Sequence, residues 1–311
     1  MKKALCLLAV LFIIAGGVLL FATFPTVLAE RAEDKLKYYT ITQNLALHYD
    51  RVEVHAINAD VTVTNAADEE EPAVVTKTDP VFAVTVTEED GHLVVRESDQ
   101  RKWYQKIGIF SPKPGKIEVR LADAVYPELI LDTKNGDLNV EAPPRTVSFE
   151  TIGTETVNGD TNIHIAVDFV VAKSVNGDLI FTIGHGSDPI TSLGQTAAVF
   201  GMTTNGNIID VSTATHKSLT SGSGKIHTSG AFTGMAKLYV KTTNGDIELD
   251  RIYGQDIQVE TVNGDVTASL WKPMNCQATS LHGDIHVPAE TGEYPFTVST
   301  TNGDITVTLA D

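Results

Sequence analysis

The feature that most constrains the fold of this chain is a short sequence that recurs about every twenty residues. Asn-Gly-Asp or a close variant occurs nine times, with successive glycines separated by 23, 18, 29, 18, 21, 19, 19 and 20 positions. These glycines are Gly136, Gly159, Gly177, Gly206, Gly224, Gly245, Gly264, Gly283 and Gly303. A repeat of this period indicates a stack of similar units that bury one continuous core.

The positions around the motif repeat as well. The residue two before the Asn is Thr or Ser in every copy, and the residue after the Asp is apolar in eight of nine. The residue six before the Asn is apolar in all copies but one, where Lys217 stands. This period-two alternation predicts strands with one buried face. We expect the hydroxyl residues to form a ladder of like side chains, and each Asp to cap its own turn.

The motif itself predicts a bend, because Asn-Gly tolerates positive φ at little steric cost. We therefore interpret the six complete copies as structural turns. Their residues are Asn135, Gly136, Asp137, Asn158, Gly159, Asp160, Asn176, Gly177, Asp178, Asn244, Gly245, Asp246, Asn263, Gly264, Asp265, Asn302, Gly303 and Asp304.

Two all-β architectures fit this pattern. The favoured one is a parallel β-solenoid (β-helix) of about nine coils over residues 126–311, because the unit length and the complete hydroxyl column suit stacked coils. In the alternative, each Asn-Gly is a type I′ hairpin turn of a meander. Residues 41–125 are expected to form an N-terminal β cap, with Asn58-Ala59-Asp60 as a degenerate copy of the motif.

The N-terminus predicts export. Lys2 and Lys3 precede an uncharged, mostly apolar run from Ala4 to Phe24, which has the roughly 20 residues needed to cross a bilayer as a helix. Residues 1–24 are interpreted as a transmembrane anchor or signal segment and residues 25–40 as a charged stalk. The expected location is the cell membrane, single-pass, with the N-terminus inside and the C-terminal domain extracytoplasmic. Secretion after cleavage near Ala29 is the alternative.

Composition excludes several classes of protein. The formal net charge of −17 argues against a general nucleic-acid binder, since an acidic surface repels phosphate. Cys6 and Cys276 are the only cysteines, too few for a disulfide framework or a cysteine-rich zinc site. The column of Asp residues leaves Ca²⁺ binding as a low-ranked alternative, but no cofactor, metal site or catalytic residue is predicted.

The repeated Thr-x-Asn-Gly-Asp-apolar unit resembles a bacterial family of β-strand-repeat proteins that carry an adhesin label and a domain of unknown function. The stretch Ile117-Glu118-Val119-Arg120-Leu121 and the run from Leu129 to Asp137 carry the same resemblance, which covers roughly residues 41–311. It implies an exported surface protein without established catalytic residues. Some relatives are single-pass proteins encoded with envelope-stress regulators.

We therefore expect a non-catalytic cell-envelope module, an adhesin or surface scaffold whose partners are the membrane, through the N-terminal helix, and envelope proteins or glycans. The alternatives are an accessory protein of an envelope-stress regulatory system and a carbohydrate-active enzyme. The enzyme ranks last because the histidines are scattered and Arg251 is the only Arg beyond residue 150, so no charge-stabilised carboxylate pair is apparent.

Two surface features add expectations. The stretch 100–117 contains basic and aromatic residues and no acidic one. The favoured interpretation is a solvated loop whose aromatic residues cover the end of the solenoid core, and the alternative is a contact with anionic headgroups or wall polymers. The candidate contact residues are Arg101, Lys102, Trp103, Tyr104 and Lys106. At the other end, the segment from Ile305 to Asp311 follows the last motif without a cap. It is expected to leave an open strand edge and to support weak self-association.

Overall fold

The computed structural model describes residues 39–67, 70–106, 114–143, 146–183, 198–229 and 235–310. Residues 40–311 form one compact unit and residues 1–39 another. The predicted membrane segment, residues 1–24, and residues 25–38 of the predicted stalk lie outside the described residues. Within the described ranges, no helix combines the length and the apolar character needed to cross a membrane.

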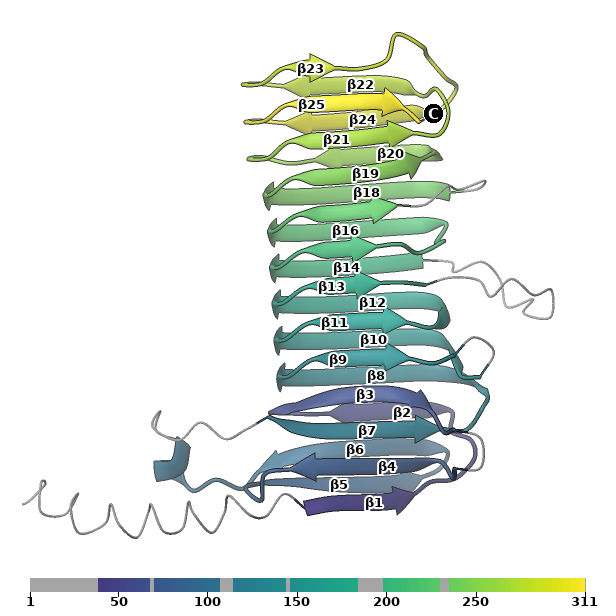
Figure 1. Ribbon diagram of the computed structural model, residues 1–311, viewed down its shortest axis with the longest axis vertical. Coiled ribbons are helices and arrows are strands. Elements are labelled where there is room, and N and C mark those ends of the chain that lie inside the picture. The colour runs from purple at the N-terminus through teal and green to yellow at the C-terminus, as the bar shows by residue number, and fades with distance from the viewer. Residues whose placement is uncertain are drawn as a thin grey trace, which may run out of the picture. The chain divides into compact units, whose positions relative to one another are not determined.

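The unit of residues 40–311 is built from two long sheets of mainly parallel strands (Figure 1). Sheet A has 13 strands and sheet B has 12. Each repeat supplies one strand to sheet B, turns at its Asn-Gly motif and supplies the next strand to sheet A; we call this pair of strands a coil. The prediction of an all-β fold with parallel pairing is confirmed, and the stack of coils is solenoid-like.

The coils that contain the nine motifs follow one another from residue 125 onward. Written as the strand of sheet B and then the strand of sheet A, they are β8 (Val125–Asn135) and β9 (Leu138–Glu141), β10 (Ser148–Asn158) and β11 (Thr161–His164), β12 (Ala166–Asn176) and β13 (Leu179–Phe181), β14 (Ala198–Asn205) and β15 (Ile208–Asp210), β16 (His216–Ser223) and β17 (Ile226–Ser229), β18 (Met235–Asn244) and β19 (Ile247–Ile252), β20 (Gly254–Glu260) and β21 (Val266–Leu270), β22 (Asn275–Ser280) and β23 (Ile285–His286), and β24 (Pro295–Thr300) and β25 (Ile305–Leu309).

The N-terminal part extends the same sheets and then ends them. Its elements are β1 (Tyr39–Asn44), β2 (Arg51–His55), β3 (Ala59–Asn65), β4 (Ala73–Thr78), β5 (Phe82–Glu89), β6 (His92–Asp99), the short 3₁₀ helix η1 (Trp103–Lys106) and β7 (Gly115–Leu121). β2 and β6 continue sheet B in parallel, and β3 and β7 continue sheet A. β4 then runs antiparallel to β7, and β5 antiparallel to β6. Antiparallel strands therefore close the parallel stack at this end.

The order of the coils in space departs from their order in the chain at both ends. The β2/β3 coil lies between β6/β7 and β8/β9, and the β24/β25 coil lies between β20/β21 and β22/β23 (Figure 1). The expectation of an open edge at the chain's last strand is therefore wrong. β25 pairs with β21 on one side and with β23 on the other. The strands left at the edge are β22 and β23.

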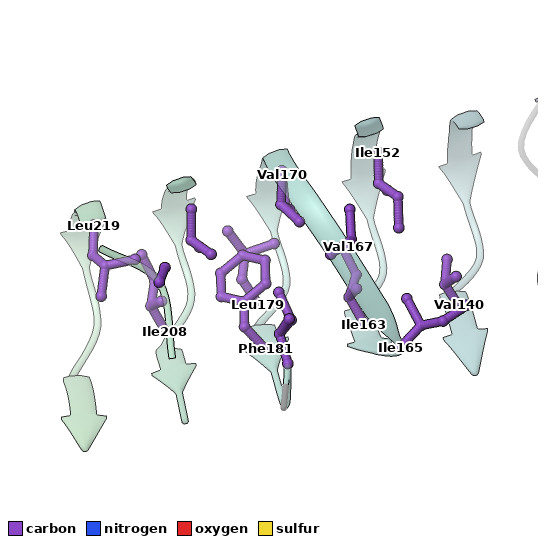
Figure 2. Packing of buried hydrophobic residues seen from close by; sticks show 14 of the residues in the cluster. Val140, Ile152, Ile163, Ile165, Val167, Val170, Leu179, Phe181, Ile208 and Leu219 are labelled. Carbon is purple, nitrogen blue, oxygen red and sulfur yellow. The ribbon is translucent and has the colours of Figure 1, made fainter. Parts of the chain in front are cut away.

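The core lies between the two sheets, where equivalent residues of successive coils stack in register. Ile163 pairs with Val140 of one neighbouring coil and with Phe181 of the other, and all three side chains are fully buried. Figure 2 shows these residues with side chains from sheet B, such as Ile152 and Val170, packed across from them. The period-two pattern thus gives each coil one apolar layer, which the coils on either side cover.

The glycine of each turn is required for a reason other than the predicted one. Positive φ is found at Gly136 and Gly159 but is not a property of the whole column. What the column shares is close approach: a Cβ on Gly245 would lie 2.1 Å from the carbonyl oxygen of Gly224. The same clash recurs along the stack, for example at Gly264, where a Cβ would lie 2.0 Å from the Gly245 oxygen. Any side chain here would push two coils apart.

We predict that Gly245→Val lowers the stability of the fold by about 1–3 kcal/mol or more, because two backbones must separate to admit the side chain. Asp246→Ala should cost about 1 kcal/mol, since it removes one hydrogen bond to a backbone N–H. Gly153→Ala is the matched control, because a Cβ there meets only the Leu129 oxygen at 4.0 Å. Thermal unfolding measures all three variants. Equal melting shifts for Gly245→Val and Gly153→Ala would contradict the close-approach assignment.

Candidate functional site

The turns stack along one edge of the sheets, which we call the turn edge, and their Asn side chains form a ladder. The side-chain amide of Asn158 donates to Oδ1 of Asn135 at 2.9 Å, and that of Asn176 donates to Asn158 at 2.9 Å. At the opposite end of the turn edge, Asn263 donates to Asn244 and Asn302 donates to Asn263, each at 2.7 Å. The amides of the predicted turn residues are therefore used between coils.

The Asp residues of the motif also act between coils. The backbone N–H of Asp160 donates to Oδ1 of Asp137 at 2.9 Å, and the N–H of Asp178 donates to Asp160 at 2.8 Å. The expectation that each Asp caps its own turn is wrong, because the carboxylate lies nearer the N–H of the adjacent coil. Lys225 fits the column for the same reason: only its backbone N–H is needed, and it donates to Oδ1 of Asn207 at 2.8 Å.

The Thr and Ser side chains two positions before each Asn also bond to the adjacent coil. Oγ1 of Thr203 donates to the carbonyl oxygen of Gly177 at 3.0 Å, and Oγ of Ser221 donates to the Gly206 oxygen at 2.8 Å. The predicted ladder of like side chains is therefore incorrect; these hydroxyls instead bond the carbonyl that the tightly packed glycine of the adjacent coil presents, whereas Oγ of Ser174 has no hydrogen-bond partner among the described residues. These hydroxyl side chains are buried, for example Thr242 at 0% exposure, so the bond replaces water that cannot reach the site.

The polar side chains of the turn edge are thus largely used in hydrogen bonds between coils. Among the residues that the structure describes, no group of three His, Cys, Asp or Glu side chains lies close enough to hold a metal ion. The Asp column therefore offers no geometric support for the Ca²⁺ alternative.

At the degenerate coil, the turn's backbone N–H groups donate to a buried carboxylate that the sequence analysis did not identify. Oε2 of Glu97, in β6, accepts the backbone N–H groups of Ile57 and Asn58 at 2.6 and 2.8 Å. Beside this turn, Asp60 accepts the N–H of Asp137, as a motif Asp would. Only the pairing of β2 with β6 reveals the role of Glu97, because no repeated pattern marks it.

The basic residues of the predicted anion-contact segment are partly neutralised. Arg101 donates through Nε and Nη2 to the carboxylate of Asp99 at 2.9 and 3.0 Å, and Lys106 Nζ lies 3.4 Å from the same carboxylate. The Arg101 guanidinium holds the pKa of Asp99 well below its usual range. Trp103 is exposed in η1, whereas residues 107–113 and the Tyr104 side chain lie outside the description. Whether the segment meets an anionic surface stays a prediction.

The outer face of sheet B carries exposed aromatic side chains that the repeat analysis did not single out. Phe169 of β12 and Phe200 of β14 lie on neighbouring strands with ring centroids 5.5 Å apart, and they are 37% and 40% exposed. Met202, one outward position further along β14, is 55% exposed, and exposed Lys173 pairs with it in register. We call Phe169, Phe200 and Met202 the aromatic patch. Large apolar residues at outward positions of the period-two pattern were the sequence signal from which this patch could have been predicted.

The exceptional Lys217 lies inside the core and is paired there. Its Nζ is 2.7 Å from Oδ2 of Asp210, and both side chains are 0% exposed. Lys217 also donates to the carbonyl oxygen of Ser212 at 2.7 Å. Oδ2 of Asp210 accepts from Thr228 Oγ1 at 2.8 Å, and Oδ1 accepts the Ser212 N–H at 3.1 Å. The two charges are thus hydrogen-bonded on several sides, as buried charges must be.

We predict that Lys217→Met lowers stability by about 3–5 kcal/mol, because it leaves the Asp210 carboxylate buried without its counter-charge. The double variant Asp210→Val, Lys217→Met should recover most of that loss, since Val is the residue at the equivalent position 140. Chemical unfolding of the single and double variants measures the coupling. Additive losses in the double variant would show that the pair has no mutual stabilisation.

The sequence model of the Toastrack DUF4097 family matches residues 49–311. A search among curated proteins finds no match. A "putative adhesin" from Bacteroides fragilis NCTC 9343 is similar in structure at 11% identity and a TM-score of 0.45, over 88% of this chain and 98% of that one.

Two further solved structures, each also described as a "putative adhesin", are similar. The protein from Parabacteroides distasonis ATCC 8503 has 10% identity and a TM-score of 0.45, over 88% of this chain and 97% of its own. The protein from Parabacteroides merdae ATCC 43184 has 9% identity and a TM-score of 0.45, over 89% and 97%. The family match alone spans far more than half of the sequence, and the chain belongs to the Toastrack DUF4097 family.

Proposed function

We propose that this protein is a non-catalytic binding module of the cell envelope, exported and held at the membrane by residues 1–24. Its ligand is an extended glycan of the envelope, bound along the outer face of sheet B. The aromatic patch is the observation that carries this proposal.

The patch has the properties of a flat binding platform. Phe169, Phe200 and Met202 are large apolar side chains exposed on one rigid sheet, where folding leaves them no partner among the described residues of the core. Contiguous exposed apolar side chains of this kind mark interaction sites. Aromatic rings bury much area at low entropic cost, and neighbouring strands present these two diagonally, offset by two residues in register.

The flanking side chains suit a polar polymer rather than an apolar partner. Exposed Lys173 and Glu155 pair with each other in register beside the patch. Tyr239 continues the column of Phe200 two strands further on, through Ser218. Rings that stack on the apolar faces of sugar rings, next to groups that bond hydroxyls, favour a glycan over a purely hydrophobic ligand.

The glycan prediction is tested by sedimenting the folded protein with insoluble envelope glycan. Phe169→Ala with Phe200→Ala should reduce the bound fraction at least tenfold, because both stacking rings are lost. The matched control is Ile209→Ala with Val211→Ala; Ile209 lies in β15 of sheet A and Val211 follows that strand directly, and the two side chains are 37% and 46% exposed. Equal binding by both double variants would exclude the patch. Absence of wild-type binding would favour the accessory-protein alternative instead.

The membrane prediction concerns residues 101–106. Binding of the anchorless protein to vesicles containing anionic lipid should weaken as salt rises, and Lys102→Glu with Lys106→Glu should weaken it further. Lys237→Glu, at an exposed position of β18, is the control for net charge alone. Flotation with the vesicles measures binding. If the control variant loses as much binding as the double variant, the segment makes no specific contact.

A further inference from the structure

One end of the stack in residues 40–311 is unpaired in the described structure. β22 is the last strand of sheet B and pairs only with β24, while β23 is the last strand of sheet A and pairs only with β25. We call β22, β23 and the residues 281–284 that join them the open end. One side of each of these strands presents backbone N–H and C=O groups that every interior coil uses for pairing.

The apolar layer of the open end is also uncovered. Ile285 is 41% exposed, whereas Ile305, its register partner one coil further in, is 0% exposed. Val287, the next inward position, is 42% exposed, whereas the equivalent Val307 is 4% exposed. In the interior of the stack, a coil on each side buries such residues. The open end therefore lacks what one more strand layer would supply.

The charges at this end permit a second copy to approach. β22 contains no charged side chain, and Asp284 is the only carboxylate between Asn275 and Val287, in a chain with 40 acidic residues. At the other end, the edge strand of sheet B is β5, which carries Glu88 and Glu89, and the edge strand of sheet A is β1, which has no charged side chain. The two Glu residues discourage strand pairing at β5. In sheet B, two copies of this chain would thus repel each other less at β22 than at β5.

The capped end determines the symmetry. In a head-to-tail contact, β22 would have to pair with β5, the edge strand of sheet B at that end, which carries Glu88 and Glu89. An open end can meet another open end across a two-fold axis, with the two β22 strands antiparallel. We propose that the protein forms a symmetric dimer through its open end, independently of any glycan binding. The dimer is closed and does not extend into filaments.

The contact is small, which makes the dimer weak. β22 has six residues and β23 has two, so the buried area falls at the low end, below about 1,200 Å² in total. We therefore expect the protein to be monomeric at micromolar concentration and to form dimers as its concentration rises toward several hundred micromolar.

Light scattering of the full-length protein in detergent micelles tests the proposal, because it reports protein mass separately from detergent. The mass should rise with concentration from 33.5 kDa toward twice that value. Gln277→Lys, at an exposed position of β22, should abolish the rise. Thr297→Lys is the control: it lies in β24, directly paired with Gln277 and exposed on the same face, but one coil in from the edge.

Amide hydrogen exchange gives a second readout, which uses the wild-type protein and needs no substitution. Exchange of residues 275–280 should slow as concentration rises, while exchange of β5 stays constant. The proposal is overturned by a wild-type mass that stays monomeric, by association that Gln277→Lys leaves intact, or by particles larger than a dimer.

Discussion

Backbone pairing of each coil with its neighbours, in one fixed register, is the constraint on which the rest of this structure depends. The register brings each turn glycine against the carbonyl of the next, so closely that a Cβ would lie about 2 Å from that oxygen at most turns. Once this contact is set, the Asn amides, Asp carboxylates and Thr hydroxyls all face the adjacent coil. Side-chain hydrogen bonds then hold a spacing that the backbone has already fixed.

The same constraint explains how the stack ends. A coil that pairs on one side only exposes backbone groups and half of its apolar layer. The first and last coils of the chain avoid this, since each inserts between two others. Antiparallel strands close one end of the stack, and the other end keeps an edge that is nearly free of charge. The fold therefore places its last coil inside the stack and leaves β22 and β23 as the edge strands at that end.

Sequence periodicity predicts much of this, because one coil's pattern contains its own strand, turn and buried face. Contacts between coils are harder to predict. Lys217 stands out in its column, yet its partner Asp210 becomes visible only when β15 and β16 are placed in the stack. The Asp assignment failed because the partner of each carboxylate is one coil away rather than within the turn. The Thr assignment failed because the hydroxyl bonds a backbone carbonyl of the adjacent coil rather than the next hydroxyl. The insertion of β24/β25 leaves no local signature, because an inserted coil has the same pattern as any other.

The outward positions carry whatever the protein binds, and the repeat does not constrain them. The column of Phe169 is otherwise polar or small. That of Phe200 varies between large residues such as Tyr239 and small ones such as Ser218. A search for repeated columns therefore passes over both. A structural role accounts for the turn edge, and a buried ion pair accounts for Lys217. That leaves the aromatic patch and the open end as the surfaces with a chemistry the fold itself does not require.

Disulfide trapping of coil order tests the central claim most directly, because directly paired residues on parallel strands lie within the Cα separation of about 4.4–6.8 Å that a disulfide needs. In a background without Cys6 and Cys276, cysteines at Thr267 of β21 and Thr306 of β25 should cross-link on oxidation, since these residues are register partners. Cysteines at Thr267 and His286 of β23 should not, because β25 lies between them. The reverse result, with Thr267 joined to His286 and not to Thr306, would show coils stacked in chain order and contradict the account.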